Sequence, residues 1–321
     1  MFVLSCDIKI GKVSFTSVVD VQIKRSIHNL AATAVLKLPV TAVLKYAGTP
    51  PTYIETVNSI KVGDPVSIRL GYDNLQMETE FNGYVKQINE KKPLEIECED
   101  EFYKIRSKPC KFNEEETTLK ECLTALFPDI RIGSCMDLTL KNFTLEPTNG
   151  ADVLSKLKQQ YGLTIFFDVD GRLYAGKADG YRSGEVKYRL RDNVIKDDDL
   201  KAVSAKDVKM KVKATGMLID GSTKNSEVGT DGGAVKELTF YGVEDVKELK
   251  ELAELELKRH CFDGYRGKLE TFLAPYACPG MVARLEDPVY KERNGNYYIE
   301  SVDVSFGRNG ARRKVEIGSK V

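Results

Sequence analysis

The chain has 321 residues, and its 48 basic and 48 acidic side chains give a formal net charge of +0. This length allows two or three compact units, each able to bury a hydrophobic core without disulfides or metals. The balanced charge excludes a global positive field of the kind that binds nucleic acid or an anionic membrane surface.

The cysteines indicate a reducing compartment. The chain has seven of them, an odd number, and no two have the Cys-x-x-Cys spacing of a metal or redox site. We interpret them as reduced, partly buried thiols, which suits folding in a cytosol. No basic segment followed by an apolar core stands at the N-terminus, and no run of about eighteen apolar residues occurs. We therefore expect neither a secretion signal nor a membrane span.

The first third of the chain has the pattern of an antiparallel β-module. Alternating apolar and polar residues predict two strands between residues 13 and 38 and three more at residues 65–71, 78–88 and 94–99. The segment that begins at Thr41 and ends at Ile60 contains Pro50-Pro51, which predicts a surface excursion. We expect partner contacts on this excursion.

The middle of the chain changes character. Thr117 or Thr118 can cap a helix that ends before Pro128, and a second helix is predicted to begin near Asn149 and to stop at Gly162. Two strands then alternate around Val169-Asp170-Gly171, where Asp-Gly suits a tight hairpin turn. Residues 106–190 are therefore predicted to form an α+β insert.

A row of lysines opens the last third. Lys209, Lys211 and Lys213 alternate with apolar residues, so a strand would place three ammonium groups on one face. Such a row suits a phosphate-tracking stripe, a channel lining or a guard against edge pairing. Because no aromatic side chains are interleaved with it, nucleic-acid binding is weakly supported, and we favour a solvated or channel-lining strand.

A long helix follows a glycine-rich stretch. Residues 221–233 are predicted to be a mobile loop. The segment from Asp245 to His260 is predicted to be helical, because its apolar residues form one stripe with lysines and glutamates opposite. The stripe comprises Val246, Leu249, Leu252, Ala253 and Leu257. We expect partner contacts here too, and β-structure from there to the end of the chain.

No residue set has the spacing of a catalytic, cofactor or metal site. Asp168-Val169-Asp170-Gly171 resembles the start of a calcium loop, but the remaining oxygen ligands are missing, which favours a hairpin turn. His28 and His260 are the two histidines, and neither has a pattern that suggests Cys-His catalysis. The acidic runs at residues 114–116 and 197–199 are interpreted as solvated turns. We assign no catalytic residue, no cofactor and no metal.

One order of short segments occurs twice, about two hundred residues apart. In the first copy, Lys24-Arg25 and a strand ending at Pro39 precede Gly63, Asn82-Gly83-Tyr84-Val85 and Ile96-Glu97-Cys98. In the second, Lys258-Arg259 and a strand ending at Pro275 precede Gly280, Asn296-Tyr297-Tyr298-Ile299 and Val315-Glu316-Ile317. Shared order predicts an internal repeat. The expected fold is mainly β, with two related antiparallel β-barrel domains, residues 1–105 and 191–321, flanking a small α+β domain at residues 106–190.

Six short segments form a pattern that extends over most of the chain. They are Arg25-Ser26-Ile27-His28-Asn29-Leu30-Ala31-Ala32-Thr33, Gly63-Asp64-Pro65-Val66, Phe81-Asn82-Gly83-Tyr84-Val85, Asp152-Val153-Leu154-Ser155-Lys156-Leu157, Tyr241-Gly242-Val243-Glu244-Asp245 and Ser305-Phe306-Gly307. This pattern resembles the baseplate hub proteins of contractile phage tails, including the Mu-like tail protein and late control protein families. The base of the type VI secretion spike is similar.

The resemblance implies a structural subunit that forms a homotrimer, whose six barrels make a pseudo-sixfold ring between a hexameric tail tube and a trimeric spike. Expected partners are the tail tube protein, a spike or needle protein and other baseplate proteins. Type VI spikes continue into a needle whereas this sequence ends at Val321, so we expect any needle to be a separate chain. The resemblance further implies synthesis in the bacterial cytoplasm and assembly into a virion tail or phage-like particle.

Two other classes of protein remain open. A tail-associated cell-wall hydrolase or glycan-binding module would use the α+β insert, and a hydrolase would need a pair of acid/base carboxylates. Many carboxylates are present, but the sequence singles none out. A secreted binding module is disfavoured by the free-thiol pattern and by the lack of a visible signal segment.

Overall fold

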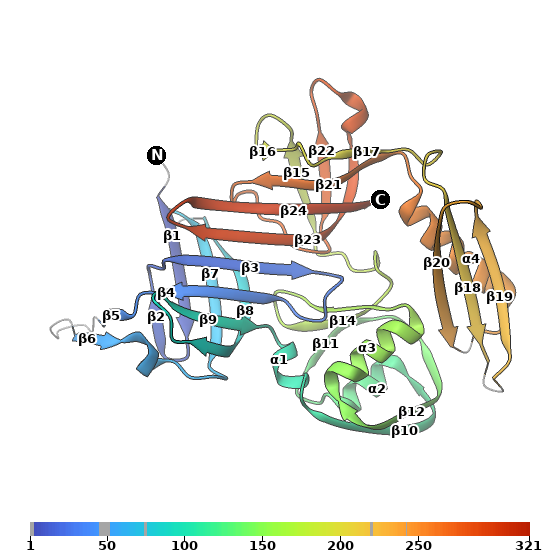
Figure 1. Cartoon of the computed structure of the whole chain (residues 1–321), viewed down its shortest axis with the longest axis horizontal. Helices are drawn as coiled ribbons and strands as arrows, with labels where there is room; N and C mark the ends of the chain where they lie inside the picture. Colours follow the sequence, from blue (N-terminus) through green and yellow to red (C-terminus); the bar gives the residue numbers. More distant parts are fainter. Residues whose placement is uncertain (1–2, 45–51, 74–75, 219–220, 242) are drawn as a thin grey trace.

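The computed structural model describes residues 3–44, 52–73, 76–218, 221–241 and 243–321. Within these ranges the chain is mainly β, with two β-modules, a small α+β insert and two excursions (Figure 1). The predicted fold class, mainly β with an α+β insert, is confirmed.

The first β-module is an antiparallel sheet in the spatial order β3-β4-β9-β8-β7-β1-β2. Alternate side chains enter its core: in β4, Ala34, Leu36 and Leu38 are buried and their neighbours are half-buried. Figure 1 shows β1 and β7 crossing behind β3 and β4, so the sheet folds over its own core. The strands are β1 (Leu4–Ile10), β2 (Val13–Phe15), β3 (Asp20–Ser26), β4 (Thr33–Leu38), β7 (Pro65–Tyr72), β8 (Gln76–Asn89) and β9 (Leu94–Glu99).

The strands of the second β-module follow the order β15-β22-β23-β24-β21, with β16 and β17 both paired to β21. A short 3-10 helix, η2 (Lys291–Arg293), lies between β22 and β23. The strands are β15 (Glu185–Arg189), β16 (Val194–Lys196), β17 (Lys201–Val203), β21 (Gly264–Thr271), β22 (Val282–Glu286), β23 (Gly295–Gly307) and β24 (Gly310–Lys320).

The two modules repeat one pattern of strand pairing. In the first module β4 pairs with β9, β9 with β8, and β8 with β7. In the second, β21 pairs with β24, β24 with β23, and β23 with β22. All six pairings are antiparallel. The modules diverge at the next strand, because β1 runs antiparallel to β7 whereas β15 runs parallel to β22.

Gly63 and Gly280 occupy the same position in the two modules. Their φ angles are +88° and +90°, in the left-handed region that favours glycine. The amide of Gly63 donates to the carbonyl of Val85 at 2.8 Å, and the amide of Gly280 donates to that of Ile299 at 2.9 Å. A β-bulge follows both acceptors, after Val85 and after Ile299. The landmark pair read from the sequence is therefore structurally equivalent.

The final landmark pair also coincides, but two earlier ones do not. Val85 faces Cys98 across the sheet as Ile299 faces Ile317. Lys24-Arg25 lies on β3, whereas Lys258-Arg259 lies in the helix α4 (Val246–His260), so the two basic pairs are not equivalent. The strands equivalent to β3 are β16 and β17, because they pair with β21 as β3 pairs with β4. Pro39 and Pro275 are not equivalent either. The strand registers make Leu36 equivalent to Leu269, so the equivalent of Pro39 is Phe272.

One sheet runs through both modules. β3 pairs antiparallel with β23, with Ile23 opposite Val304. A single hydrophobic core draws buried side chains from residues 6–98 and from residues 186–317. The two modules are thus fused along an edge. The domain limits at residues 105 and 190 stay a prediction.

The α+β insert has a separate core formed by residues 102–175. Its helices begin at the predicted caps: the Thr118 hydroxyl accepts from the amide of Glu121 at 3.2 Å, and the Asn149 side chain accepts from that of Asp152 at 3.0 Å. Gly162 ends α3 with a φ of +61°. The elements are α1 (Phe102–Ile105), β10 (Pro109–Thr118), α2 (Leu119–Leu126), β11 (Arg131–Cys135), β12 (Thr139–Asn149), α3 (Gly150–Tyr161), β13 (Thr164–Phe167) and β14 (Arg172–Gly176).

The excursion of the second module, which we call the helical excursion, is a three-stranded sheet covered on one face by a helix. Its elements are β18 (Met210–Met217), β19 (Thr223–Gly229), β20 (Ala234–Tyr241) and α4 (Val246–His260). The predicted long helix is present, and it packs mainly on β18 and β19 around a small core of its own, with a smaller contact to β24 of the β-module. β19 occupies much of the glycine-rich stretch predicted to be a mobile loop, since its backbone pairs with β18.

The excursion of the first module is a β-hairpin that projects from the module body (Figure 1). It is formed by β5 (Thr41–Leu44) and β6 (Thr52–Glu55), followed by the 3-10 helix η1 (Thr56–Ser59). The Pro50-Pro51 pair of the sequence lies outside the described residues.

Alanine substitutions test the equivalence of the two glycines. Gly63→Ala and Gly280→Ala should each lower the free energy of unfolding by about 1 kcal/mol, because alanine disfavours positive φ. Gly280→Ala should cost more, since its Cβ would lie 2.3 Å from Cδ1 of Tyr181, whereas the Cβ at Gly63 would lie 3.5 Å from the Tyr103 hydroxyl. Urea denaturation measures both. Gly232→Ala, with a φ of +83° and open space around it, isolates the backbone cost; a Gly280→Ala cost no larger than that control would contradict the prediction.

Candidate functional site

The joint between the two modules centres on a buried ion pair. Arg313 on β24 and Glu80 on β8 form a two-pronged contact: Nη2 lies 2.6 Å from Oε1 and Nη1 lies 3.1 Å from Oε2. Their side chains are 0% and 1% exposed. Such paired geometry is the strongest form of arginine–carboxylate contact. It fixes a residue of the second module to one of the first.

Further hydrogen bonds surround this pair. Arg313 also donates to the carbonyls of Ala277 at 2.8 Å and Leu273 at 3.0 Å, both in the connection between β21 and β22. Arg25 on β3 donates to the backbone carbonyl of Glu80 at 2.9 Å and to the Tyr276 hydroxyl at 3.4 Å. Burial disfavours the charged form of Arg25, but Tyr276 and Glu80 outweigh it, so the pKa of Arg25 lies above its usual value.

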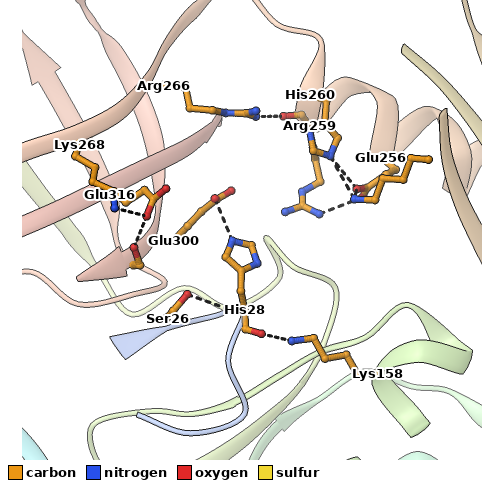
Figure 2. Close-up of polar contacts among 12 residues, drawn as sticks. Ser26, His28, Lys158, Glu256, Arg259, His260, Arg266, Lys268, Glu300 and Glu316 are labelled. Carbon is orange, nitrogen blue, oxygen red and sulfur yellow. Dashed lines mark hydrogen bonds and ion pairs between the residues drawn. The ribbon is translucent and has the colours of Figure 1, made fainter. Parts of the chain in front are cut away.

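Polar contacts also tie the insert to this joint (Figure 2). His28, in the connection between β3 and β4, lies with Nε2 3.1 Å from Oε2 of Glu300 on β23. Lys158 on α3 donates to the backbone carbonyl of His28. Burial raises the pKa of Glu300, but the hydrogen bond from His28 and the charges of His28, Arg259 and Arg266 together outweigh burial and hold that pKa below its usual value. His28 therefore contacts both the second module and the insert.

The end of α4 carries a second polar cluster (Figure 2). Glu256 accepts from Lys236 and from Arg259 at 3.1 Å, and it lies 3.1 Å from Nε2 of His260. Arg266 on β21 donates to the carbonyl of Arg259 at 2.9 Å, which links the helix to the second module. Burial raises the pKa of Glu256, but the contacts with His260, Lys236 and Arg259 outweigh it, so that pKa is lowered.

The lysine row lies on the outer face of the helical excursion. Met210, Val212 and Ala214 turn toward α4, so the lysines that alternate with them point away from it. Lys211 pairs with Glu227 at 2.9 Å and Asp231 at 2.6 Å, and Lys213 lies 3.7 Å from Glu227. Lys209 precedes β18 and is exposed. The row is not an edge guard, because β18 is paired on both sides.

The predicted partner-contact elements lie at opposite ends of the molecule (Figure 1). Thr41 begins the hairpin and is exposed, whereas Ile60 is buried in the core of the modules. Asp245 caps α4 through the amide of Lys247 at 2.9 Å, and His260 ends it inside the Glu256 cluster. The structure does not bring the lysine row and the hairpin together as one site. Contact of these elements with partners stays a prediction.

A cleft of about 720 Å³ between the insert and the joint contains the Asp168 turn. Asp168 accepts from the amides of Asp170 and Arg172, each at 2.9 Å, which confirms the hairpin-turn interpretation. Among the described residues, no group of three or more His, Cys, Asp or Glu side chains is placed to hold a metal ion. No helix within the described ranges is long and apolar enough to cross a membrane.

Reasoning from the sequence missed the Glu80–Arg313 pair. The signal was available in the repeat, because the strand registers make Arg313 equivalent to Leu94. Along β24 the core-facing positions read Ala311, Arg313, Val315 and Ile317. One charge in an apolar alternation implies a buried partner.

Comparisons with known proteins identify the fold. No protein-family model and no curated protein matches the sequence. Solved structures do match, over 97–98% of this chain. A tail protein from Neisseria meningitidis MC58 matches with a TM-score of 0.67 at 11% identity, covering 96% of that chain. The 43 kDa tail protein of prophage MuSo2 from Shewanella oneidensis matches with a TM-score of 0.61 at 16% identity, covering 97% of that chain.

A third match is a component of the type VI secretion system of E. coli, with a TM-score of 0.57 at 10% identity and coverage of 76% of that chain. That protein is described as structurally similar to tail proteins of bacteriophage T4. The chain therefore has the fold of phage tail proteins, and the resemblance seen in its sequence is confirmed at the level of the fold.

Removing one member of the buried pair should be strongly destabilising. Arg313→Met leaves the Glu80 carboxylate without its buried counter-charge and should lower the free energy of unfolding by about 3–5 kcal/mol. The Glu80→Met/Arg313→Met double variant should recover most of that loss, and urea denaturation at fixed protein concentration measures it. Arg312→Met, at a neighbouring half-exposed position, should cost less than about 1 kcal/mol. A double variant as unstable as Arg313→Met would show that the loss does not come from leaving the Glu80 carboxylate unpaired.

The Glu256 cluster should make the free energy of unfolding depend on pH in the acidic range. Because its native pKa lies below the ordinary value of 4.5, the stability that Glu256 contributes is present above that value and is lost as the pH falls through the native pKa. The difference in the free energy of unfolding between the wild type and Glu256→Gln should therefore shrink below pH 4.5. Glu254→Gln, at an exposed position on the same helix, serves as the control and should show no such change. A difference independent of pH would contradict the assignment.

Proposed function

We propose that this chain is a structural baseplate hub subunit of a phage-like contractile tail or related injection machine, and that three copies form a ring of six β-modules. The observation that carries the proposal is the repeat: two modules in one chain share their strand pairing, their glycine turn and their bulge. The fold shared with tail proteins supports it. The role is structural, with no bond made or broken.

An unpaired strand edge in the first module supports ring formation. The N-terminal half of β23 pairs with β22, and its C-terminal half, from Ser301 to Gly307, pairs with β3. The equivalent strand β8 pairs with β7 as far as Tyr84. Beyond Val85, β8 has β9 on one side, and no described strand lies on the other. A free edge of this kind is a template for pairing with another chain.

The second module offers the matching edge. β16 and β17 are equivalent to β3, and both pair with β21 on one side. Among the strands that the structure describes, none pairs with their other side. By analogy with β23, which lies against β3 within a chain, we expect residues 86–89 of one copy to pair with β16 and β17 of the next. This is a head-to-tail contact, which forms a ring when its rotation closes.

Such a ring would adapt one symmetry to another. Six similar modules would present a near-sixfold surface to a tail tube protein, while the hairpin and the helical excursion recur three times and suit a trimeric spike or needle protein. Other baseplate proteins would bind the outer surface. We further propose synthesis in the bacterial cytoplasm and assembly into a virion tail or phage-like particle.

Light scattering on the purified chain at micromolar concentration tests the ring. The expected mass is three times the 35.9 kDa of one chain, and negative-stain images should show six lobes. A protein that stays monomeric, even with its spike partner, would overturn the proposal.

A charge substitution tests the predicted edge. Within the chain, Asp303 lies opposite Lys24, and their equivalents across the proposed contact are Asn89 and Lys201. Asn89→Lys should weaken the trimer by placing two like charges opposite each other, and adding Lys201→Asp should restore it. The dissociation constant from light scattering at several concentrations is the readout. An unchanged trimer in Asn89→Lys would mean that the ring closes through another surface.

A further inference from the structure

The contact between the modules extends beyond the paired strands. The connection between β21 and β22, residues 272–281, packs on the adjoining ends of β7 and β8 in the first module. The amide of Leu273 donates to the hydroxyl of Tyr72 on β7 at 3.2 Å, and the Tyr276 hydroxyl lies 3.5 Å from the carbonyl of Thr79 on β8. A connection of one module therefore docks on the end of a specific strand pair of the other.

The equivalent connection of the first module is the one that holds the β5–β6 hairpin, residues 39–64. Four large apolar side chains among its described residues are exposed, and two of them, Val43 at 44% and Tyr53 at 76%, lie opposite each other on the hairpin strands. The other two are Val40 and Val62. The hairpin strands pair only with each other in the part of the chain that the structure describes, and Figure 1 shows them projecting from the module. Exposed apolar side chains gathered on a projecting element mark an interaction surface.

The equivalent of the β7–β8 turn in the second module is the connection between β22 and β23, residues 287–294. It also exposes two apolar side chains, Val289 at 54% and Tyr290 at 48%. The side chain of Asp287 holds this connection in shape by accepting from the amides of Val289 at 2.8 Å and Tyr290 at 3.0 Å. Beside it lies a hollow of about 1050 Å³ lined in part by Asp287, Lys291 and Asn294.

We propose that the β5–β6 hairpin of one copy docks on residues 287–294 of the next copy, with Val43 and Tyr53 packed against Val289 and Tyr290. The proposal rests on the ring proposed above and names a second contact within it. We expect a second copy of this chain to bind residues 287–294, because the equivalent contact already exists within one chain. There, residues 272–281 of the second module pack on β7 and β8 of the first.

The chemistry of the two surfaces is complementary. Arg191 and Arg293 flank Tyr290, with guanidinium carbons 5.8 Å and 5.5 Å from its ring centre. Because Tyr290 is 48% exposed, a second aromatic ring from the hairpin can pack on the exposed part of its ring or on these guanidinium planes. The contact buries apolar and aromatic groups, which supplies association energy.

Disulfide trapping tests the contact. The Tyr53→Cys/Tyr290→Cys variant, oxidised under mild conditions, should give covalent dimers and trimers on a non-reducing gel. Each single variant should stay a monomer there, because the native cysteines are free thiols and five of the seven are buried. The control is Tyr53→Cys/Val235→Cys, since Val235 on β20 is 55% exposed and lies on the helical excursion, away from the proposed contact.

The outcomes separate the contact from the ring. Covalent trimers in the first variant and none in the control support the proposal. The hairpin contact would be overturned, and the ring left in place, if light scattering shows trimers but Tyr53→Cys/Tyr290→Cys gives no more covalent species than the control. A monomeric wild type would overturn both. As a second measurement, Tyr53→Ser/Tyr290→Ser should weaken trimer formation at least tenfold, and an unchanged dissociation constant would count against the contact.

Discussion

The relative position of the two β-modules depends on one buried contact, the pair between Glu80 and Arg313. Taking both charges out of water is costly, and their attraction offsets that cost only when geometry and remaining hydrogen bonds are satisfied. Here the two side chains meet through two hydrogen bonds, and the carbonyls of Leu273 and Ala277 accept two more from Arg313. Among the described residues, Nε of Arg313 has no hydrogen-bond partner. This arrangement ties β24 to β8. The edge pairing of β3 with β23 and the connection at residues 272–281 join the same two modules around it.

The repeat gives the modules a common frame, and the excursions make them different. The first module extends its connection between β4 and β7 into a hairpin, whereas the second places a sheet and a helix between β17 and β21. Neither insertion interrupts the shared strands, because both arise from surface connections. A chain built in this way keeps similar surfaces on the shared strands and distinct surfaces on the excursions, which is what a symmetry-adapting ring requires.

The sequence predicted the parts of the fold that have local causes. The two helices of the insert were predicted from caps at Thr117 or Thr118 and near Asn149. The repeat was predicted from a shared order of landmarks that included Gly63 and Gly280, whose backbone conformations favour glycine. Pairing between distant strands leaves weaker signals, so β16 and β17 were not recognised as the counterpart of β3. Lys258-Arg259 seemed equivalent to Lys24-Arg25 because short basic pairs carry little information. Arg313 was overlooked because the residue type alone does not distinguish a buried arginine from an exposed one.

The Glu80–Arg313 contact has no counterpart at the proposed contact between copies, where the equivalent positions hold Asn294 and Leu94. The joint inside a chain is therefore made once, during folding, and is costly to open because opening separates buried charges. In the proposed ring, the joint between chains would lack that pair and would form reversibly between folded subunits. A ring of this kind would have three permanent seams and three separable ones in alternation. Under mechanical load it would come apart into whole chains, each still carrying two intact modules.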